Sequence, residues 1–371
     1  MAERVDPLIL KDIKQFGLSD WNACYHCGNC TASCPLTEQG FLFPRKDIRL
    51  MQMGLKNNLE QHVEPWLCYY CGDCSKTCPR DANPGEIMMS LRRYLTSMYD
   101  WTGLSKKLYT SKVWEFGAII VLALSVLVLW LWKTTPPTAG TQGVNIEQWA
   151  SVKTIHKGDW IMAGILVFFL VSNIINMYYK IIIKDKSLKI SFTTYITEFW
   201  SLIWHFGSQS KLSKCETKYY WGAHWFLMSG YVLLFGMIVF LLPWFQDYNV
   251  NQWPIQRILG YYATIGLFVG IVYFTYNRIT KAEEHSKHSH VTDWTFLVLL
   301  FFTTLSGILL HYFRMTGAAS AWYYTYLIHL MVLVPMLMIE VPFSKWSHLA
   351  YRPFAIYFSK IKQASVSKVT V

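Results

Sequence analysis

Charged residues are scarce in this sequence. Only 15% of its 371 residues are Asp, Glu, Lys or Arg, whereas 53% are hydrophobic and 17% are aromatic. Residues 1–112 hold 14 Lys and Arg against 12 Asp and Glu, which is the balance of a soluble domain, and residues 113–371 hold 20 against 11, almost all between long apolar runs. Basic residues beside apolar spans normally record membrane topology. The net charge of +11 therefore does not indicate nucleic-acid binding.

Cysteine is sparse outside one stretch. Eight of the nine cysteines form two copies of the run C-x2-C-x2-C-x3-C-P, at 24–35 and 68–79. This run binds a [4Fe–4S] cluster, so two copies predict two clusters. Three closely spaced thiolates cover one face of a cubane and the fourth points away, so we expect the runs to exchange fourth ligands. The predicted ligand sets are Cys24, Cys27, Cys30 and Cys78 for the first cluster, and Cys68, Cys71, Cys74 and Cys34 for the second.

Two other uses of these cysteines fit less well. Structural zinc is usually held by two separated C-x2-C pairs, and a run of three cysteines plus Cys-Pro exceeds its four ligands. Disulfides suit small secreted domains, and residues 1–14 do not read as a signal peptide. The ninth thiol, Cys215, lies alone in the sequence, and we expect it at the surface.

The chain divides into a soluble part and a membrane part, and we predict an all-α protein. Residues 1–100 are expected to form a helical ferredoxin-like domain with two [4Fe–4S] clusters, residues 101–112 a basic linker, residues 113–350 a membrane cytochrome b-type bundle, and residues 351–371 a cytoplasmic tail. Six apolar runs are each about the ~20 residues that a membrane-crossing helix needs. The predicted spans are 113–132, 160–183, 221–245, 258–277, 294–313 and 321–339.

The basic residues also predict the orientation. Six spans return the chain to its starting side, and of the 20 basic residues after residue 112, 15 fall on that side and 5 opposite. The positive-inside rule then places the cluster domain and the carboxyl terminus in the cytoplasm. The segment 190–206 is shorter and aromatic, and it reads as an interfacial helix on the same face.

Histidines in the membrane part are candidate haem ligands, because ionisable residues inside a bilayer are costly and usually functional. His224 and His348 belong to the cytoplasmic side, while His311 and His329 belong to the outer side. A low-spin haem b takes two axial imidazoles from facing helices. The pair His224 and His348 therefore predicts one haem b, and the pair His311 and His329 could hold a second. The alternative is that each histidine has a structural role only, as a polar contact between helices.

The remaining polar residues are weaker candidates. A quinone site needs an apolar slot near a haem and a group that passes protons, and its candidates are His156, Asp159, Arg314 and Glu340. We expect His205 to lie on the interfacial segment. The tract containing His285, His288 and His290 is most simply a solvated loop, although histidine-rich tracts can also bind metal.

Several segments resemble known proteins. The first cysteine run, the segment FPRKDIRLMQMGL and the run CYYCGDCSKTCP resemble the HdrC protein of heterodisulfide reductase. The segments WGAHWFLMSG and IHLMVLVPMLMIEVPFSKWSH resemble the membrane cytochrome b family that includes HdrE and the nitrate reductase gamma subunit. A single chain that joins these parts in this order is similar to the QmoC family, the membrane subunits of the quinone-interacting membrane-bound oxidoreductase. The resemblance covers nearly the whole chain.

This resemblance implies a quinone-linked oxidoreductase subunit in the cytoplasmic membrane. Its implied partners are two HdrA-like flavin and iron–sulfur proteins, QmoA and QmoB, and it would exchange electrons between menaquinone and adenylylsulfate reductase in dissimilatory sulfur metabolism. The sequence departs from the gamma-subunit pattern at Leu234, ten residues after His224, so a second haem would need His311 as the partner of His329. The alternatives are the same electron path serving heterodisulfide or sulfite reduction, and a membrane sensor or transporter with structural clusters.

Overall fold

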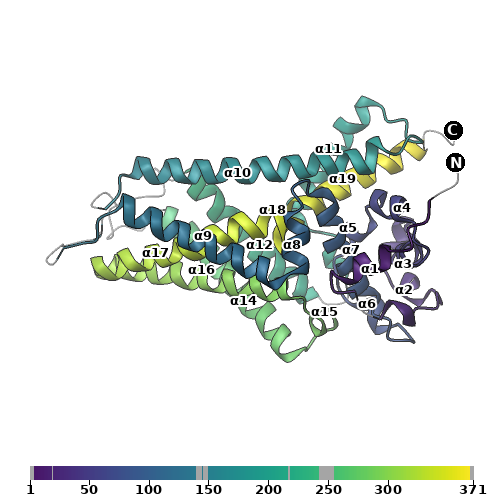
Figure 1. Cartoon of the computed structure of the whole chain (residues 1–371), viewed down its shortest axis with the longest axis horizontal. Coiled ribbons are helices and arrows are strands. Elements are labelled where there is room, and N and C mark those ends of the chain that lie inside the picture. The colour runs from purple at the N-terminus through teal and green to yellow at the C-terminus, as the bar shows by residue number, and fades with distance from the viewer. Residues whose placement is uncertain are drawn as a thin grey trace.

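The computed structural model describes residues 4–18, 20–138, 144, 149–215, 218–241 and 255–367. Within these residues the chain is helical and contains no strand. A bundle of long helices occupies one end of the molecule, and a compact group of short helices from the amino-terminal third occupies the other (Figure 1). The prediction of an all-α protein is thereby confirmed.

The amino-terminal domain packs short helices around one long helix. The long helix, α7 (Pro84–Tyr99), begins at a proline, whose missing N–H group costs nothing in a first turn. Most of its residues are buried, so it is the central support of the domain. The short helices are α1 (Ile9–Lys14), α2 (Asn29–Ala32), α3 (Arg45–Gln52), α4 (Lys56–Gln61), α5 (Glu64–Leu67) and α6 (Asp73–Lys76).

The two cysteine runs share one local backbone. Gly28 and Gly72, which occupy equivalent places in the runs, have φ angles of 94° and 91°, a left-handed conformation that glycine adopts without strain. Each glycine starts a four-residue helix, α2 or α6. The runs also meet, because the hydroxyl oxygens of Ser33 and Thr77, again at equivalent places, lie 3.0 Å apart. The fourth cysteine of each run follows this contact, which brings the ends of both runs together.

Six helices are long and apolar enough to cross a membrane. Five of them extend the predicted span by a few residues at one or both ends, because helices continue past the hydrocarbon layer into the interface. The third begins three residues before its predicted span and ends at Val239, short of the predicted residue 245. Residues 242–245, at the end of the third predicted span, lie outside the described residues. The helices are α9 (Lys112–Lys133), α10 (Val152–Tyr178) with the π-helical turn η4 (Tyr179–Ile183), α12 (Lys218–Val239), α14 (Ile255–Thr280), α16 (Val291–Thr316), and α17 (Ala319–Pro335) with the π-helical turn η6 (Met336–Glu340) and α18 (Val341–Phe343).

Helices α12 and α14 pack with their backbones unusually close. A Cβ atom added to Gly230 would lie 2.6 Å from the carbonyl oxygen of Ala263, and one added to Gly266 would lie 2.7 Å from that of Phe226. Small residues allow such approach between membrane helices. This packing fixes the position of α12 and therefore of His224, which lies near its first turns.

The membrane bundle and the amino-terminal domain share a hydrophobic core. Helix α19 (His348–Ser367), which covers most of the segment expected to be a tail, contributes Tyr351 and Ile361 to a core that also contains Trp66 and Ile87 of the amino-terminal domain. The basic segment expected as a linker contains the short helix α8 (Leu104–Thr110). The helix expected at 190–206 is present as α11 (Phe192–Ser208), and it packs along α19.

Candidate functional site

The second cysteine run and the end of the first run line one cavity. Its walls include Cys34, Cys68, Cys71 and Cys74, and we call it the cysteine cavity. Lys211, Lys214 and Cys215, from the segment between α11 and α12, also line it. The donor set therefore suits an iron–sulfur cluster, since four thiolates are available from one side and cationic residues from the other.

The first three cysteines of the first run lie near the last cysteine of the second. Cys30 interacts electrostatically with Cys24, Cys27 and Cys78. Burial raises the pKa of the Cys30 thiol to about 11. A thiolate at this position therefore needs a cation beside it, and iron would supply one.

Backbone amides point at the ligand sulfurs of both groups. The N–H of Tyr70 donates to Cys68 Sγ at 3.3 Å, and the N–H of Ala82 donates to Cys78 Sγ at 3.4 Å. Hydrogen bonds to ligand sulfurs are one of the means by which a protein sets cluster potentials. The two groups differ in exposure, because Cys27 is exposed to solvent whereas Cys68 and Cys74 are buried.

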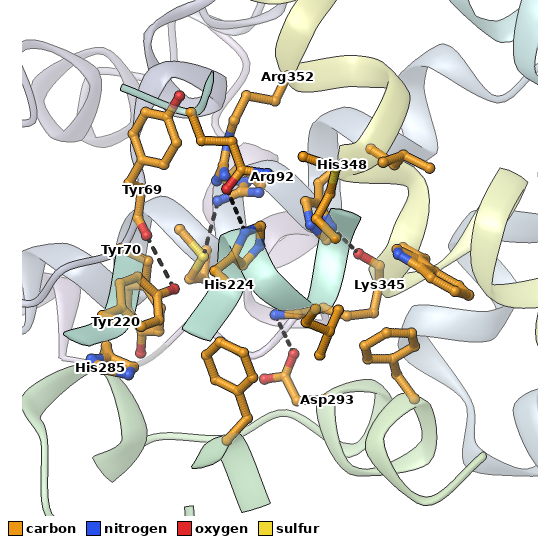
Figure 2. Close-up of a pocket in the computed structure, with 18 of the residues that line it drawn as sticks. Tyr69, Tyr70, Arg92, Tyr220, His224, His285, Asp293, Lys345, His348 and Arg352 are labelled. Atoms are coloured by element: carbon orange, nitrogen blue, oxygen red, sulfur yellow. Dashed lines mark hydrogen bonds and ion pairs between the residues drawn. The ribbon is translucent and has the colours of Figure 1, made fainter. Parts of the chain in front are cut away.

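A second cavity lies between the cysteine cavity and the membrane helices, and we call it the histidine cavity (Figure 2). His224 of α12 and His348 of α19 enter it with ring centroids 6.1 Å apart and ring planes inclined by 52°. His224 Nδ1 donates to Gln209 Oε1 at 2.7 Å, and His348 Nδ1 donates to the carbonyl oxygen of Lys345 at 2.7 Å. Each bond fixes the tautomer that leaves Nε2 free to bind a metal. Burial lowers the pKa of His348 well below its usual value, so that ring is neutral, as a metal ligand must be.

Two arginines, Arg92 and Arg352, stand beside the histidines and line the same cavity (Figure 2). Arg92 and Arg352 both donate to the carbonyl oxygen of Cys68, at 3.3 Å and 2.8 Å. Among the described residues neither guanidinium forms an ion pair with a carboxylate. Burial and the nearby Arg352 lower the pKa of Arg92 to about 9, which leaves it charged at neutral pH. Two cations in one cavity that have no carboxylate partner among the described residues are suited to an anionic ligand.

A buried ionic group closes the opposite wall of the histidine cavity. Asp293 forms ion pairs with Arg93 at 3.7 Å, with Arg278 at 3.6 Å, and with Lys345. Arg93 also pairs with Glu86 at 3.0 Å. Because Arg93 belongs to α7 and the other cations to the membrane part, this group joins the two halves of the chain.

Comparison with known proteins bears on the cysteine cavity. A family model described as a 4Fe-4S dicluster domain matches residues 20–82. An HdrC-like protein of Archaeoglobus profundus, named for its likeness to the C component of heterodisulfide reductase, is 30% identical to the chain over 128 residues. The matched residues span 33% of this chain and 68% of that protein. The chain belongs to the HdrC-like proteins. No solved structure matches it.

This HdrC-like protein is a membrane iron–sulfur component of the electron-transfer class. The dicluster match supplies the iron–sulfur character, and the likeness to a heterodisulfide reductase component implies a redox role. Six apolar helices fit a multi-pass membrane protein.

Each of the two outer histidines makes a polar contact of its own. In the described part of the chain, His329 Nδ1 lies 2.8 Å from the Ser306 hydroxyl, and His311 Nε2 lies 2.8 Å from the Tyr261 hydroxyl. His329 stands ten residues into α17, so a rise of 1.5 Å per residue puts it about 15 Å deep, near the middle of the bilayer. The two histidines expected to bind a second haem therefore lie at different depths along their helices, and each is engaged in its own polar contact.

The quinone-site candidates are also dispersed. His156 and Asp159 lie in the first turns of α10, where His156 accepts a hydrogen bond from Trp160, and Arg314 lies in the last turn of α16. Glu340 lies at the opposite end of the bundle, in the π-helical turn η6, where it is fully buried and accepts a bond from the backbone of Lys345 at 3.2 Å.

Two expectations about surface residues were wrong. Cys215 is buried, with only 7% of its surface exposed, and its sulfur lies within 4.8 Å of that of Cys71. The neighbouring Cys71 thiol, together with burial, raises the pKa of Cys215 far above its usual range. The histidine tract is not a free loop either: His285 packs on Tyr220 with ring centroids 4.4 Å apart, and His288 bonds to Asn83 of the cluster domain.

Sequence reasoning also missed Gln209, Arg92 and Arg352 as parts of a site. Gln209 and Arg352 occupy segments with no motif, and Arg92 was grouped with basic residues that flank the first span. Their role depends on how α11, α19 and α7 come together, and no local pattern carries that information.

Proposed function

We propose that this chain carries electrons between a membrane quinone and cytoplasmic redox partners, through haem b at His224 and His348 and two [4Fe–4S] clusters. The observation that carries the proposal is the separation of the two imidazole rings. Two imidazoles that bind one metal from opposite sides, with metal–nitrogen distances of about 2 Å, have centroids roughly 6 Å apart, and the rings here are 6.1 Å apart. Bis-histidine ligation is a common way for bundles to hold haem between helices.

The arginines support an anionic porphyrin in particular. Haem b carries two propionate groups, and Arg92 and Arg352 offer two guanidinium groups without carboxylate partners among the described residues. Both arginines line the histidine cavity, and their long side chains are suited to turn from the Cys68 carbonyl to the propionates.

The cysteine ligand sets are proposed as the sequence predicts them. Cys34 lines the cavity of the second run, and Cys78 interacts with Cys30 of the first. When bound, haem and clusters supply one-electron carriers at fixed positions. The chain's residues hold these carriers in place, exclude water from the buried thiols and hold the two histidines in their metal-binding tautomers.

The walls of the cavities suggest the order of the carriers. Tyr69 and Tyr70 line both the histidine cavity and the cysteine cavity, so the second cluster would lie next to the haem. The first cluster would lie farther out, at the exposed Cys27. We therefore propose that electrons pass between haem and the second cluster, and that a soluble partner meets the first cluster.

The finer assignment rests on the sequence resemblance. It favours a QmoC-type subunit that uses menaquinone and works with QmoA- and QmoB-like proteins next to adenylylsulfate reductase, with its cluster domain in the cytoplasm. Partners that serve heterodisulfide or sulfite reduction would use the same electron path. Purification of the complete complex, followed by identification of the co-purifying subunits, distinguishes these cases.

Reduced-minus-oxidised difference spectra of the purified full-length chain test the haem. The proposal expects sharp b-type bands, and it expects that menaquinol analogues reduce the clusters. A protein with full iron–sulfur content and no b-type bands would overturn the proposed path and favour a sensor with structural clusters.

A further inference from the structure

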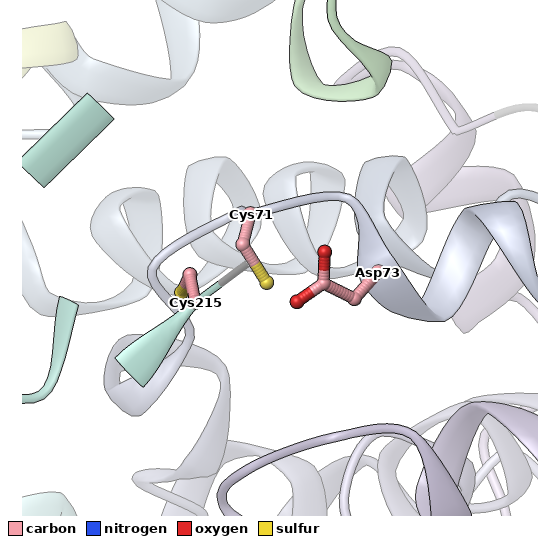
Figure 3. A group of neighbouring side chains, drawn as sticks. All are labelled: Cys71, Asp73 and Cys215. Atoms are coloured by element: carbon pink, nitrogen blue, oxygen red, sulfur yellow. The ribbon is translucent and has the colours of Figure 1, made fainter. Parts of the chain in front are cut away.

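The ninth cysteine lies against the second cysteine run. Cys215 follows the short helix η5 (Leu212–Lys214), in the segment between α11 and α12, so the membrane half of the chain supplies it. Its sulfur, the sulfur of Cys71 and a carboxylate oxygen of Asp73 lie within 4.8 Å of one another (Figure 3). Cys71 also packs against the hydrophobic cluster that contains Cys215, so the two thiols are neighbours. Hydrophobic packing with Tyr69 and Leu212 keeps water from this contact.

The other cysteine run has no such neighbour in the described residues. The residue equivalent to Cys71 in the first run is Cys27, which is exposed to solvent. Two copies of one motif therefore differ at one ligand, and the difference arises because the membrane half covers only the second copy. Lys211 and Lys214 accompany Cys215 in lining the cysteine cavity.

A hydrogen bond between Cys215 and a cluster-bound Cys71 can have only one donor. A cluster-bound thiolate can only accept a hydrogen bond, so Cys215 must be the donor. A donor to a ligand sulfur draws negative charge from the cluster, and it stabilises the reduced form, which carries one more negative charge. Nearby lysines act in the same sense.

We propose that Cys215 is a positioning residue that donates its S–H to Cys71 and raises the reduction potential of the second cluster above that of the first. This inference rests on the proposed function, because it requires Cys71 to hold a cluster. It implies that the second cluster is tuned by the docking of the membrane half, so that an electron is held more firmly beside the histidine cavity than at the exposed first cluster.

The test compares Cys215→Ala with Cys215→Ser in the full-length chain, by redox titration followed with electron paramagnetic resonance. A single hydrogen bond contributes about 0.5–1.5 kcal/mol. Cys215→Ala should therefore shift the reduction equilibrium of the second cluster by up to about tenfold, or about 59 mV for one electron, towards the oxidised form. Cys215→Ser should keep the potential of the second cluster close to the wild-type value, because the serine hydroxyl can donate in place of the thiol. The potential of the first cluster should stay unchanged in both variants.

Iron content and a loop control separate the outcomes. Ser213→Ala changes a neighbouring residue whose hydroxyl, in the described part of the chain, donates to the Ser210 carbonyl at 2.7 Å, and it should leave both potentials unchanged. A fully loaded Cys215→Ala protein with an unchanged second potential would overturn the inference. Loss of the second cluster in both Cys215 variants would overturn it as well, since it would make Cys215 a ligand. A wild-type chain without a second cluster would instead refute the proposed function.

Discussion

The imidazole rings of His224 and His348 face one cavity with their centroids 6.1 Å apart, although they belong to different helices. Each ring is oriented by a hydrogen bond from Nδ1, to Gln209 in one case and to the Lys345 carbonyl in the other. The two acceptors come from outside the membrane-crossing helices. The geometry of the pair therefore depends on how the segments outside the membrane pack against the membrane-crossing helices.

Replacement of these rings should have a different effect from replacement of the outer histidine. His224→Ala removes one proposed axial ligand, so we expect loss of the b-type bands at unchanged iron–sulfur content. His311→Ala removes a contact with Tyr261, so we expect the inner haem spectrum to persist. Optical difference spectra and iron analysis of both proteins check this. Retained bands in His224→Ala would refute the proposed ligation.

The arginine beside the rings should control haem retention. Arg352→Gln keeps hydrogen-bonding capacity but removes the charge proposed to bind a propionate. Hydrogen bonds to charged groups contribute about 1.5–3 kcal/mol, so the haem dissociation constant should rise by about 10- to 100-fold. Transfer of haem to an excess of apomyoglobin measures this. Lys360→Gln, a cation on the same helix that does not line the cavity, is the matched control and should release haem at the wild-type rate.

Docking of the histidine tract should weaken in acid. Burial lowers the pKa of His285 to about 4, below the value of about 6.5 expected in an unfolded chain. The unfolded state binds the proton first, so this residue's contribution to stability is complete above about pH 6.5 and is lost as the pH falls towards 4. Thermal unfolding of the solubilised protein between pH 7.5 and 5 should show this loss, and His285→Gln should reduce it. An equal pH dependence in the variant would contradict the prediction.

The local features of this protein were predictable, and the contacts between its halves were not. The cysteine runs and the apolar spans are encoded by spacing and composition within short windows, so their positions followed from the sequence. Cys215 and Arg352 acquire their surroundings only when α11, α12 and α19 pack on the cluster domain. Helix α19 lacks the long apolar runs that marked the membrane spans, and it is buried between α11 and the cluster domain.

The ionic group around Asp293 should be essential for joining the halves. Asp293→Asn would leave Arg93, Arg278 and Lys345 near one another without their shared carboxylate. Removal of one partner from a buried ion pair costs about 3–5 kcal/mol, so we expect a large loss of thermal stability and faster proteolysis between α8 and α9.

The matched control for that substitution is a more exposed pair. Asp185 and Lys362 lie 3.2 Å apart, with 21% and 25% of their side chains exposed. Pairs near the surface contribute about 0–1 kcal/mol, so Asp185→Asn should unfold close to the wild-type temperature. Equal effects of the two substitutions would mean that Asp293 does not join the halves.

The exchange of fourth ligands gives the most direct test of the cluster sites. Cys78 belongs to the second run by sequence, but it interacts with Cys30 of the first. Cys78→Ala should therefore alter the paramagnetic signal of the first cluster, and Cys34→Ala should alter that of the second, because Cys34 lines the cavity of Cys68 and Cys74. The clusters can be told apart by exposure: an added chelator should attack the one at Cys27 first. If each substitution affected only the cluster of its own run, the ligands would not be exchanged.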